Sequence, residues 1–365
     1  MFRSVYAISA LLVMTAATAA AADPTPPKYK PVDKATVAAY EKFRGAHYGV
    51  LIPSEYKFHD REISDDDKDI ANGGLPGFKF SFGLPDDKMP SITVPHGMSL
   101  RSTKMTDADL AKLKGGKNLV WLDLSGNDQF ANAGLKELAG LKSLQSLDLG
   151  STSMQDASLK DLQSLENLTT LILFWNKDIT DAGIRELVGL KKLKRLDLTM
   201  AKLTDEGLKN LTALDQLTSL NIQWTTITDA GMIHLTQFKK LRHLNIAETK
   251  VTSEGIKELA GMTGLTSLDV HYTKAAGAGG IKTICGLSEL TELVVWDVAD
   301  ADMAEVRRLK KLTTLDIKGS TVTDAGLAML MTVKTLTVLK VPKGVTDAGV
   351  KKFQVALPKC VIERN

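Results

Sequence analysis

The sequence contains little of what several protein classes need. Two cysteines in 365 residues cannot form a disulfide framework, and aromatic residues make up only 5% of the chain. The formal net charge of +3 is small for this length, so charge alone does not indicate a polyanionic partner such as nucleic acid. After the first 22 residues, the sequence contains no apolar run long enough to cross a bilayer. The composition, 44% hydrophobic and 24% charged, is that of an ordinary globular protein.

The first 22 residues are typical of an export signal. Arg3 gives a positive start, residues 5–22 are uncharged and mostly apolar, and three alanines end the run before Asp23. An uncleaved membrane anchor is the alternative, although this stretch is short for a spanning helix. We therefore expect a signal peptide at 1–22 and an exported protein that is periplasmic, cell-envelope or extracellular. It should not span the membrane after cleavage.

A unit of about 24 residues recurs along most of the chain. Its marker is the second leucine of an L-x-x-L-x-[LIV] phrase. The marker positions are Met98, Leu122, Leu147, Leu171, Leu196, Leu220, Leu244, Leu268, Leu293, Leu315 and Leu339. So regular a spacing does not arise by chance, and it predicts a stack of similar elements.

Each unit combines two hydrophobic periods. In Leu196-Asp197-Leu198 the apolar residues alternate, which predicts a short half-buried strand. Leu203, Leu208 and Leu211 follow at the spacing of one helix face. A Thr-Asp pair stands where the helix would begin, because threonine caps free backbone N–H groups and aspartate favours the positive end of the helix dipole. The pair recurs at Thr106-Asp107, Thr180-Asp181, Thr204-Asp205, Thr228-Asp229, Thr323-Asp324 and Thr346-Asp347.

These phrases resemble the leucine-rich repeat proteins, here in the form L-x-x-L-x-L-x-x-[NT]-x-[IV]-T-D-A-G-L. The local form is similar to the ribonuclease-inhibitor-like and cysteine-containing subtypes and to secreted bacterial members. The resemblance implies an α/β solenoid over 98–365, a horseshoe with parallel strands on its concave face and helices on its convex face. For function it implies recognition of macromolecules and names no partner. The pattern breaks at 275–280 and 298–303, where we expect irregular units.

The residues before the repeats predict a leader and an end cap. Residues 23–35 are rich in proline and lysine and should be exposed, whereas 36–97 are more aromatic and should cover the end leucines as an N-terminal cap. Within this region we predict a helix over 33–44 and strands over 78–82 and 92–94. Trp121 should pack against this segment. At the other end, 357–362 resembles a truncated closing strand.

Large side chains in the middle of the stack form the candidate binding site. Residues that follow the strand leucines should project outward as ladders across the sheet, and two ladders hold three of the four tryptophans. Exposed aromatics are typical of interface hot spots, whereas the alternative is that the rings merely pack on one another. The candidate residues are Ile172, Phe174, Trp175, Met200, Trp224, His271, Tyr272 and Trp296.

The site favours a protein as the partner, although the sequence does not identify that protein. We expect the partner to bind the concave strand face, and we expect no cofactor or metal. The first alternative is a glycan or an anionic envelope polymer, because the same tryptophans would stack on sugar rings; the second is a structural envelope protein. Basic residues cluster in turns such as 191–195 and 239–242, but acidic residues interrupt the sustained face that nucleic acid would require.

Catalysis has little support in the sequence. It contains no H-E-x-x-H pair, no G-x-S-x-G elbow and no phosphate-binding glycine loop, so we expect a non-enzymatic protein with no catalytic residues. An enzyme would have to use His243, Asn245, Asp269 and His271, which lie on adjacent predicted strands. A further ladder of carboxylates and amides, which runs from Asp123 to Asp316, should solvate the sheet; a cationic partner or a metal is the alternative.

Overall fold

The computed structural model describes residues 29–52, 57–60, 74–85, 89–129, 132–277 and 279–364. The chain divides into two compact units, residues 1–201 and 202–365. The predicted signal peptide at 1–22 and the first part of the leader lie outside the described residues. None of the described helices is long and apolar enough to cross a membrane.

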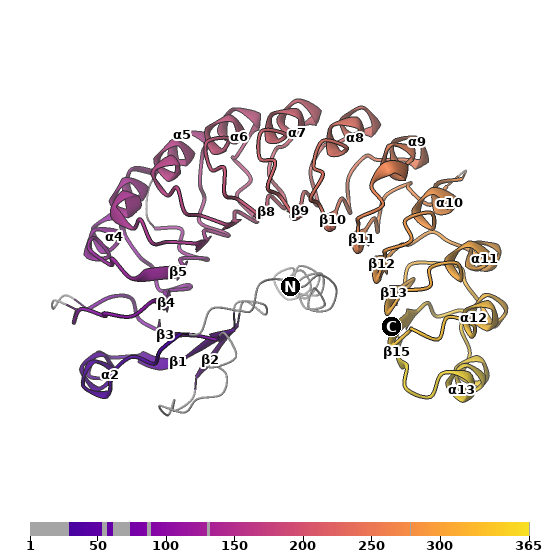
Figure 1. Ribbon diagram of the computed structural model, residues 1–365, viewed down its shortest axis with the longest axis horizontal. Helices are drawn as coiled ribbons and strands as arrows, with labels where there is room; N and C mark the ends of the chain where they lie inside the picture. Colours follow the sequence, from indigo (N-terminus) through magenta and orange to yellow (C-terminus); the bar gives the residue numbers. More distant parts are fainter. Residues whose placement is uncertain are drawn as a thin grey trace. The chain divides into compact units, whose positions relative to one another are not determined.

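Unit 1 is built on a sheet with mixed strand directions (Figure 1). Its described strands are ordered β8-β7-β6-β5-β4-β3-β1-β2; β1 pairs antiparallel with β2 and β3, and the other neighbouring pairs are parallel. The strands are β1 (Ala46–Ile52), β2 (Lys57–Asp60), β3 (Leu75–Phe80), β4 (His96–Ser99), β5 (Leu119–Asp123), β6 (Ser146–Asp148), β7 (Thr170–Ile172) and β8 (Arg195–Asp197). The helices are α2 (Lys34–Glu41), α4 (Asp107–Lys112), η1 (Asn132–Gly140), α5 (Asp156–Leu159), η2 (Lys160–Ser164) and α6 (Asp181–Leu187), where η marks a 3₁₀ helix.

Unit 2 is a regular parallel stack. Its described strands pair in chain order. Leucine lies opposite leucine from β9 to β14, as in Leu244 opposite Leu268, and Leu339 lies opposite Ile362 of β15. The strands are β9 (Ser219–Asn221), β10 (His243–Asn245), β11 (Ser267–Asp269), β12 (Glu292–Val294), β13 (Thr314–Asp316), β14 (Val338–Val341) and β15 (Val361–Arg364). The helices are α7 (Asp205–Leu211), α8 (Asp229–Leu235), α9 (Ser253–Ile256), η3 (Lys257–Gly261), α10 (Gly280–Ile284), η4 (Asp300–Asp302), α11 (Met303–Val306), α12 (Asp324–Leu330) and α13 (Asp347–Ala356).

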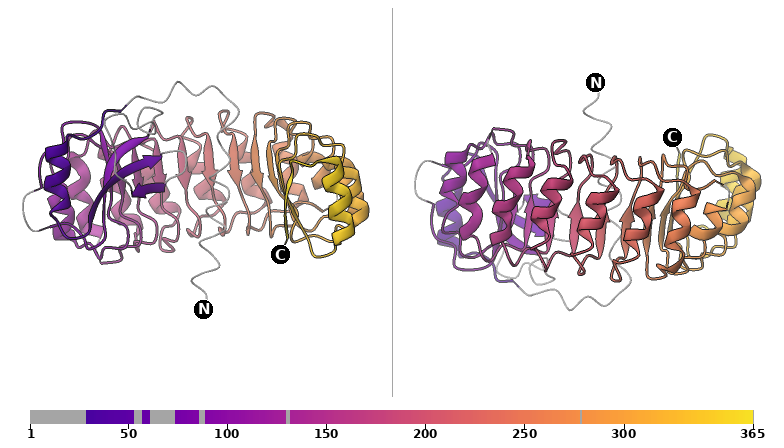
Figure 2. Two further views of the ribbon diagram at one scale, coloured as in Figure 1. Left: turned by 90° about the horizontal axis from the view of Figure 1, so that it is seen from below. Right: turned by 90° about the horizontal axis from the view of Figure 1, so that it is seen from above.

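In each unit the strands line one side and the helices the other, which Figure 2 shows from below and from above. The repeat leucines of both faces fill the space between them: Leu220 and Leu244 on the strands and Leu211 and Leu235 on the helices are almost completely buried. The predicted α/β leucine-rich solenoid is therefore confirmed. A strand and a helix of so few residues cannot bury their leucines alone, and the stack supplies the missing partners.

The T-D-A-G phrase joins consecutive repeats as well as starting a helix. Thr228 caps α8 by accepting from the backbone N–H of Ala230 at 3.3 Å, as predicted. Its hydroxyl also donates to Asp205 of the preceding repeat at 2.6 Å, and its backbone N–H donates to the same carboxylate at 2.9 Å. The glycine of the phrase leaves room for this carboxylate, since a Cβ at Gly231 would lie 2.3 Å from the Asp205 oxygen. The same Asp–Thr bonds join Asp156 to Thr180, Asp229 to Thr252, Asp300 to Thr323 and Asp324 to Thr346.

The two departures from the repeat pattern are irregular, as expected. Helix α10 begins after Gly279, which has a left-handed backbone and makes no side-chain cap. The repeat at 298–303 begins with the 3₁₀ turn η4 before the short helix α11. In both of these irregular repeats the threonine that would cap the helix is missing, so the first turn of the helix closes without a threonine cap.

The N-terminal region matches the prediction in part. Helix α2 starts after Asp33, which caps it, but the first predicted strand lies at 75–80, and 92–94 is not a strand. The Ile92 carbonyl instead accepts from the Asn118 side chain, and the strand forms at β4, where Met98 aligns with Leu122. At the C-terminal end, β15 closes the sheet slightly later than predicted.

Trp121 packs against the N-terminal segment, as predicted. Its ring is 5% exposed and lies with Leu75 and Val120, and Tyr29 packs on this cluster. Both cysteines are free and buried, and burial raises the pKa of the Cys285 thiol to about 12. At neutral pH Cys285 is therefore a thiol without nucleophilic character.

Candidate functional site

Each of the repeat strands β4 to β12 leads into a residue with a left-handed backbone. In unit 2 the φ angles of these residues lie between 51° and 60°. The backbone N–H of such a residue donates to a carbonyl of the next repeat: Trp224 bonds Ala247 at 3.1 Å, and Glu248 bonds His271 at 3.0 Å. We call these positions the turn rows. The row of unit 1 is Ser102, Gly126, Ser151, Trp175 and Met200, and the row of unit 2 is Trp224, Glu248, Tyr272 and Asp297.

Where the residue three positions before a turn-row residue is Asp or Asn, its side chain fixes the turn. Asn221 accepts from the backbone N–H of Gln223 at 3.1 Å, and Asn245 accepts from that of Ala247 at 2.9 Å. Asp197 does the same for Thr199 at 2.9 Å and is only 3% exposed. The expectation that this ladder solvates the sheet is therefore wrong. Its side chains fold back to satisfy backbone donors, as Asp and Asn commonly do in turns.

Two predicted site residues of unit 1 are covered by their surroundings. Ile172 is 5% exposed and lies in register between Asp148 and Asp197. The expectation that it contributes to an exposed apolar surface is therefore wrong. The ring of Phe174 is half-buried over Gly150, where a Cβ would lie 1.9 Å from the ring. The glycine thus makes room for the phenylalanine on one flank.

Trp175 is the exposed aromatic residue of the unit 1 turn row. Its side chain is 38% exposed, and the ammonium of Lys177 lies 4.7 Å from its ring centroid. Met200 follows it in the row and is half-buried. Of the predicted site residues in unit 1, Trp175 is therefore the exposed one, and Met200 is half-buried like Phe174.

In unit 2 the structure brings three predicted site residues into one cluster. The rings of His271 and Trp296 are 5.1 Å apart, those of Tyr272 and Trp296 are 4.4 Å apart in an edge-to-face arrangement, and those of His271 and Tyr272 are 5.5 Å apart. His271 is buried and Trp296 is half-buried, whereas Tyr272 is 58% exposed. Tyr272 is therefore the most exposed ring of this cluster.

Trp296 is fixed from two sides beyond that cluster. Its indole N–H donates to Asp316 at 3.3 Å, and its ring lies on Gly319, where a Cβ would come within 2.2 Å. Trp224, the remaining predicted residue, opens the unit 2 turn row and is 39% exposed. Trp224 and Tyr272 are two strands apart, which corresponds to about 10 Å at the usual strand spacing.

His271 is the titratable group at the centre of the cluster. Its Nδ1 lies 2.6 Å from a carboxylate oxygen of Asp269, which is 2% exposed. Burial lowers the pKa of His271, but the hydrogen bond to Asp269 and the charges of Asp269, Glu248 and Asp316 outweigh burial, so its pKa is raised overall. The imidazole is thus charged over a wider pH range than a free histidine.

The residues proposed for an enzyme alternative come together only in part. His271 and Asp269 bond each other, while Asn245 bonds the backbone of Ala247 and the side chain of Gln223. Within the described residues, no group of three histidine, cysteine, aspartate or glutamate side chains is arranged to hold a metal ion. The imidazole therefore belongs to a buried His–Asp pair beneath the exposed tyrosine.

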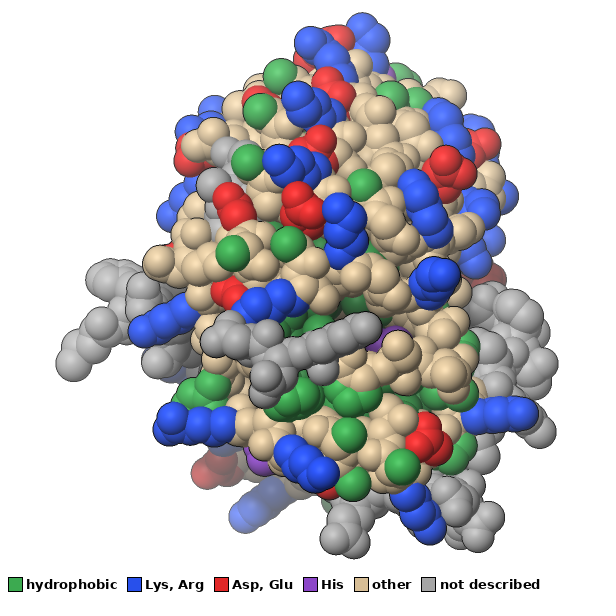
Figure 3. All heavy atoms as spheres, turned by 90° about the vertical axis from the view of Figure 1, so that its left-hand side faces the viewer, with side chains coloured by type: hydrophobic (Ala, Val, Ile, Leu, Met, Phe, Trp, Pro, Cys, Tyr) green, Lys and Arg blue, Asp and Glu red, His purple; other side chains and the backbone are tan. Residues whose placement is uncertain are grey.

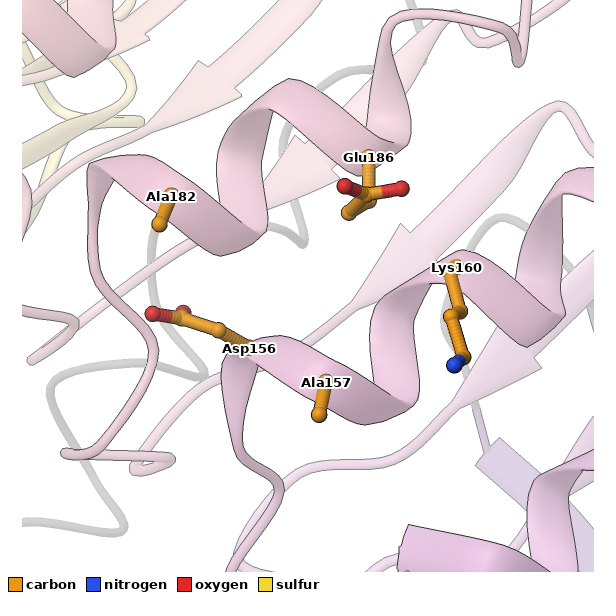
Figure 4. A pocket seen from close by; sticks show the side chains of 5 residues that line it. All are labelled: Asp156, Ala157, Lys160, Ala182 and Glu186. Atoms are coloured by element: carbon orange, nitrogen blue, oxygen red, sulfur yellow. The ribbon is translucent and has the colours of Figure 1, made fainter.

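Two other surfaces are a cavity between helices of unit 1 and a face with mixed charge. A shallow cavity of about 160 Å³ on the helix side of unit 1 is lined by Asp156, Ala157, Lys160, Ala182 and Glu186 (Figure 4). It is the groove between successive helices, and its Asp156 is already bonded to Thr180. On the face drawn in Figure 3, lysine and arginine side chains are interspersed with aspartate and glutamate, so positive charge there is broken by negative charge.

A family model described as "Leucine-rich repeat region" matches residues 99–356. The chain belongs to the leucine-rich repeat family. Among solved structures it is similar to an internalin (inlF) of Listeria monocytogenes, at 20% identity and a TM-score of 0.52 over 69% of this chain and 82% of that one. An internalin C2 of the same organism gives 24%, 0.44, 65% and 93% for the same four measures. A leucine-rich repeat protein of Leptospira interrogans gives 18%, 0.37, 73% and 83%. No curated protein matches the chain.

Sequence reasoning missed the left-handed backbone of the turn rows. The available signal was Gly126, which occupies in its repeat the position that Trp175 and Trp224 occupy in theirs. A glycine at one member of a repeated position indicates a backbone that other side chains adopt at a cost. The burial of Ile172 had no such signal, because it depends on neighbours in other repeats.

Proposed function

We propose that the protein is a non-catalytic scaffold that binds another protein through the strand side of its repeats. We place the main contact surface on the unit 2 turn row, with Trp224 and Tyr272 as the anchoring side chains. The observation that carries this proposal is that large aromatic side chains are exposed at left-handed backbone positions. There a non-glycine residue costs roughly 1–2 kcal/mol. Folding alone favours glycine or asparagine, so a function that uses the rings explains their presence.

The strand side also suits recognition because its side chains are already ordered. The turn-row backbone is hydrogen-bonded to the next repeat, and the turns are fixed by buried Asn and Asp side chains. A partner would therefore immobilise few groups that were free before, which keeps the entropy cost of binding low. Tryptophan and tyrosine are also the side chains most enriched at interface hot spots.

We also propose that the protein acts outside the cytoplasm, in the periplasm, the cell envelope or the extracellular space. The support is the sequence of residues 1–22, with Arg3, a long uncharged apolar run and small residues before Asp23. N-terminal sequencing of protein recovered from the producing cells tests this. A chain that begins near Asp23 supports export, and a chain that retains residues 1–22 contradicts it.

Affinity capture tests the binding proposal. Immobilised wild-type protein and a Trp224→Gly, Tyr272→Gly variant are incubated with envelope extract of the producing cell, and the retained proteins are compared. The matched control is Ile233→Ser, which removes an exposed apolar side chain from helix α8. The proposal expects a protein retained by wild type and by the control but lost by the row variant. Equal retention by all three proteins would overturn it.

The same experiment separates the other functions that the sequence left open. Retention of a glycan or an anionic polymer, released by simple oligosaccharides, would replace the protein partner with an envelope ligand. A wild-type protein that retains nothing would leave a structural envelope role. Before any comparison, each variant must show a cooperative unfolding transition, because a variant that has lost its fold would also lose binding.

A further inference from the structure

We propose that the unit 2 turn row recognises a basic segment of the partner protein, and that it seats a lysine or arginine side chain against Tyr272 between Glu248 and Asp297. This inference rests on the proposed function and names the chemistry of the partner. The row alternates between aromatic and acidic residues, in the order Trp224, Glu248, Tyr272, Asp297. Neighbouring positions in such a row are about 5 Å apart.

The two carboxylates beside Tyr272 are neutralised in part at most, because the protonated imidazole of His271 offsets some of the charge of Glu248. Among the described residues, no lysine or arginine forms an ion pair with Glu248 or Asp297, whereas the more distant Glu363 pairs with Lys318 and Lys340. Asp297 is exposed and Glu248 is half-buried, so both are within reach of a partner. A positive side chain would complement this negative charge, and complementary charge favours the right partner and speeds association.

The aromatic rings add a second attraction for a cation. A lysine or arginine placed over a tyrosine or tryptophan ring is attracted by the negative face of the π-system. Unit 1 contains an internal example at its own turn row, where the ammonium of Lys177 lies 4.7 Å from the Trp175 centroid. In the described part of unit 2, no lysine or arginine of the chain occupies the Tyr272 face. That face is exposed and available to a cation from outside.

The cluster beneath Tyr272 holds its ring in place for this contact. Trp296 meets Tyr272 edge to face at 4.4 Å and is itself fixed by Asp316 and by Gly319. Trp296 and His271 are therefore positioning residues, and Tyr272 with its two flanking carboxylates makes the contact. Because the contact combines charge with a ring, a partner rich in glutamate or one made of neutral sugar would not satisfy it.

Binding of synthetic peptides to the full chain tests the proposal. The probes are an oligolysine peptide, an oligoarginine peptide, and serine and glutamate peptides of the same length, measured by calorimetry at low and high salt. The proposal expects the basic peptides to bind more tightly than the serine peptide and to weaken as salt rises. Glu248→Gln with Asp297→Asn should weaken basic-peptide binding roughly tenfold, and Tyr272→Leu by a few-fold, while Tyr272→Phe retains it.

The matched control is Glu258→Gln, which removes one exposed carboxylate from the helix side of unit 2. It should leave the affinity of the basic peptides unchanged. Equal binding of serine and lysine peptides, or an equal effect of Glu258→Gln and of the two row substitutions, would overturn the proposal. If capture from extract still depends on Trp224 and Tyr272 but the basic peptides fail, only this inference falls. If capture is independent of the row, the proposed function falls as well.

Discussion

The hydroxyl of Thr228 donates a hydrogen bond of 2.6 Å to the Asp205 carboxylate of the preceding repeat. A Cβ atom added to Gly231 would lie only 2.3 Å from an oxygen of this carboxylate, so the glycine leaves the space that the carboxylate needs. The glycine of T-D-A-G therefore belongs to the contact between repeats, and a helix capped only by its own threonine would not need it. The same three-residue relationship at Asp229, Thr252 and Gly255 supports this interpretation.

Gly231→Ala should destabilise the protein by about 1–3 kcal/mol, because the new methyl group displaces the Asp205 carboxylate from Thr228. Thermal or denaturant unfolding measures this. The control is Gly261→Ala, since a Cβ at Gly261 would meet nothing within 4 Å. The control should change stability by less than about 0.5 kcal/mol. Equal stability of the two variants would contradict the account of the motif.

Trp224→Gly should be more stable than Trp224→Ala by up to about 1 kcal/mol, because the two variants lose the same ring and only glycine adopts the left-handed backbone without strain. The order should reverse at Val355, which is exposed on helix α13 and where alanine favours the helix. Unfolding free energies of the four variants test both statements. If alanine is the better residue at both positions, the strain assigned to the turn row is wrong.

Asp148→Asn should stabilise the protein at pH 7. Burial first, and then the negative charge of Asp123, raise the pKa of Asp148 well above its ordinary value. The folded protein therefore binds this proton more tightly than the unfolded chain, and stability falls as pH rises from the ordinary value to the raised one. Asparagine keeps the acceptor for the Gly150 N–H, as Asn221 and Asn245 do in their repeats. The gain in melting temperature should disappear at acidic pH; a loss of stability at pH 7 would contradict this.

Glu292→Gln should stabilise the protein by up to roughly 3 kcal/mol at pH 8 and by little at pH 5. Glu292 is 7% exposed, and burial raises its pKa to about 7, with the Ser267 hydroxyl opposing the shift. The stability of the wild type should thus fall between the ordinary pKa of a glutamate and about 7, because only the folded state retains the proton there. Melting temperature against pH for both proteins tests this, and parallel curves would contradict it.

The leucine spacing was enough to predict the strands, the helices and the direction of stacking. Consecutive repeats share one sequence pattern, so each forms the same local structure. The Thr-Asp pair predicted the helix starts, and the broken pattern at 275–280 predicted an irregular turn. What the local pattern could not show is contact between repeats. The Asp205–Thr228 bond and the burial of Ile172 depend on residues one repeat away.

The side chains proposed for the site are arranged only partly as the sequence predicted. Trp175, Trp224 and Tyr272 are exposed as expected, and Tyr272 and Trp296 lie together. His271 is buried, since it bonds Asp269 two residues earlier instead of facing solvent. Alternation along a strand predicts which side a residue faces, but the turn after the strand follows other rules.

The most direct test of the central claim is side-chain footprinting of the protein with and without its captured partner. Hydroxyl-radical oxidation of Trp224 and Tyr272 is compared with that of Met262 and Met331, which follow the helices η3 and α12. The account predicts that the partner protects Trp224 and Tyr272 and leaves both methionines unchanged. Protection confined to the methionines, with Trp224 and Tyr272 oxidised as before, would contradict recognition through the turn row.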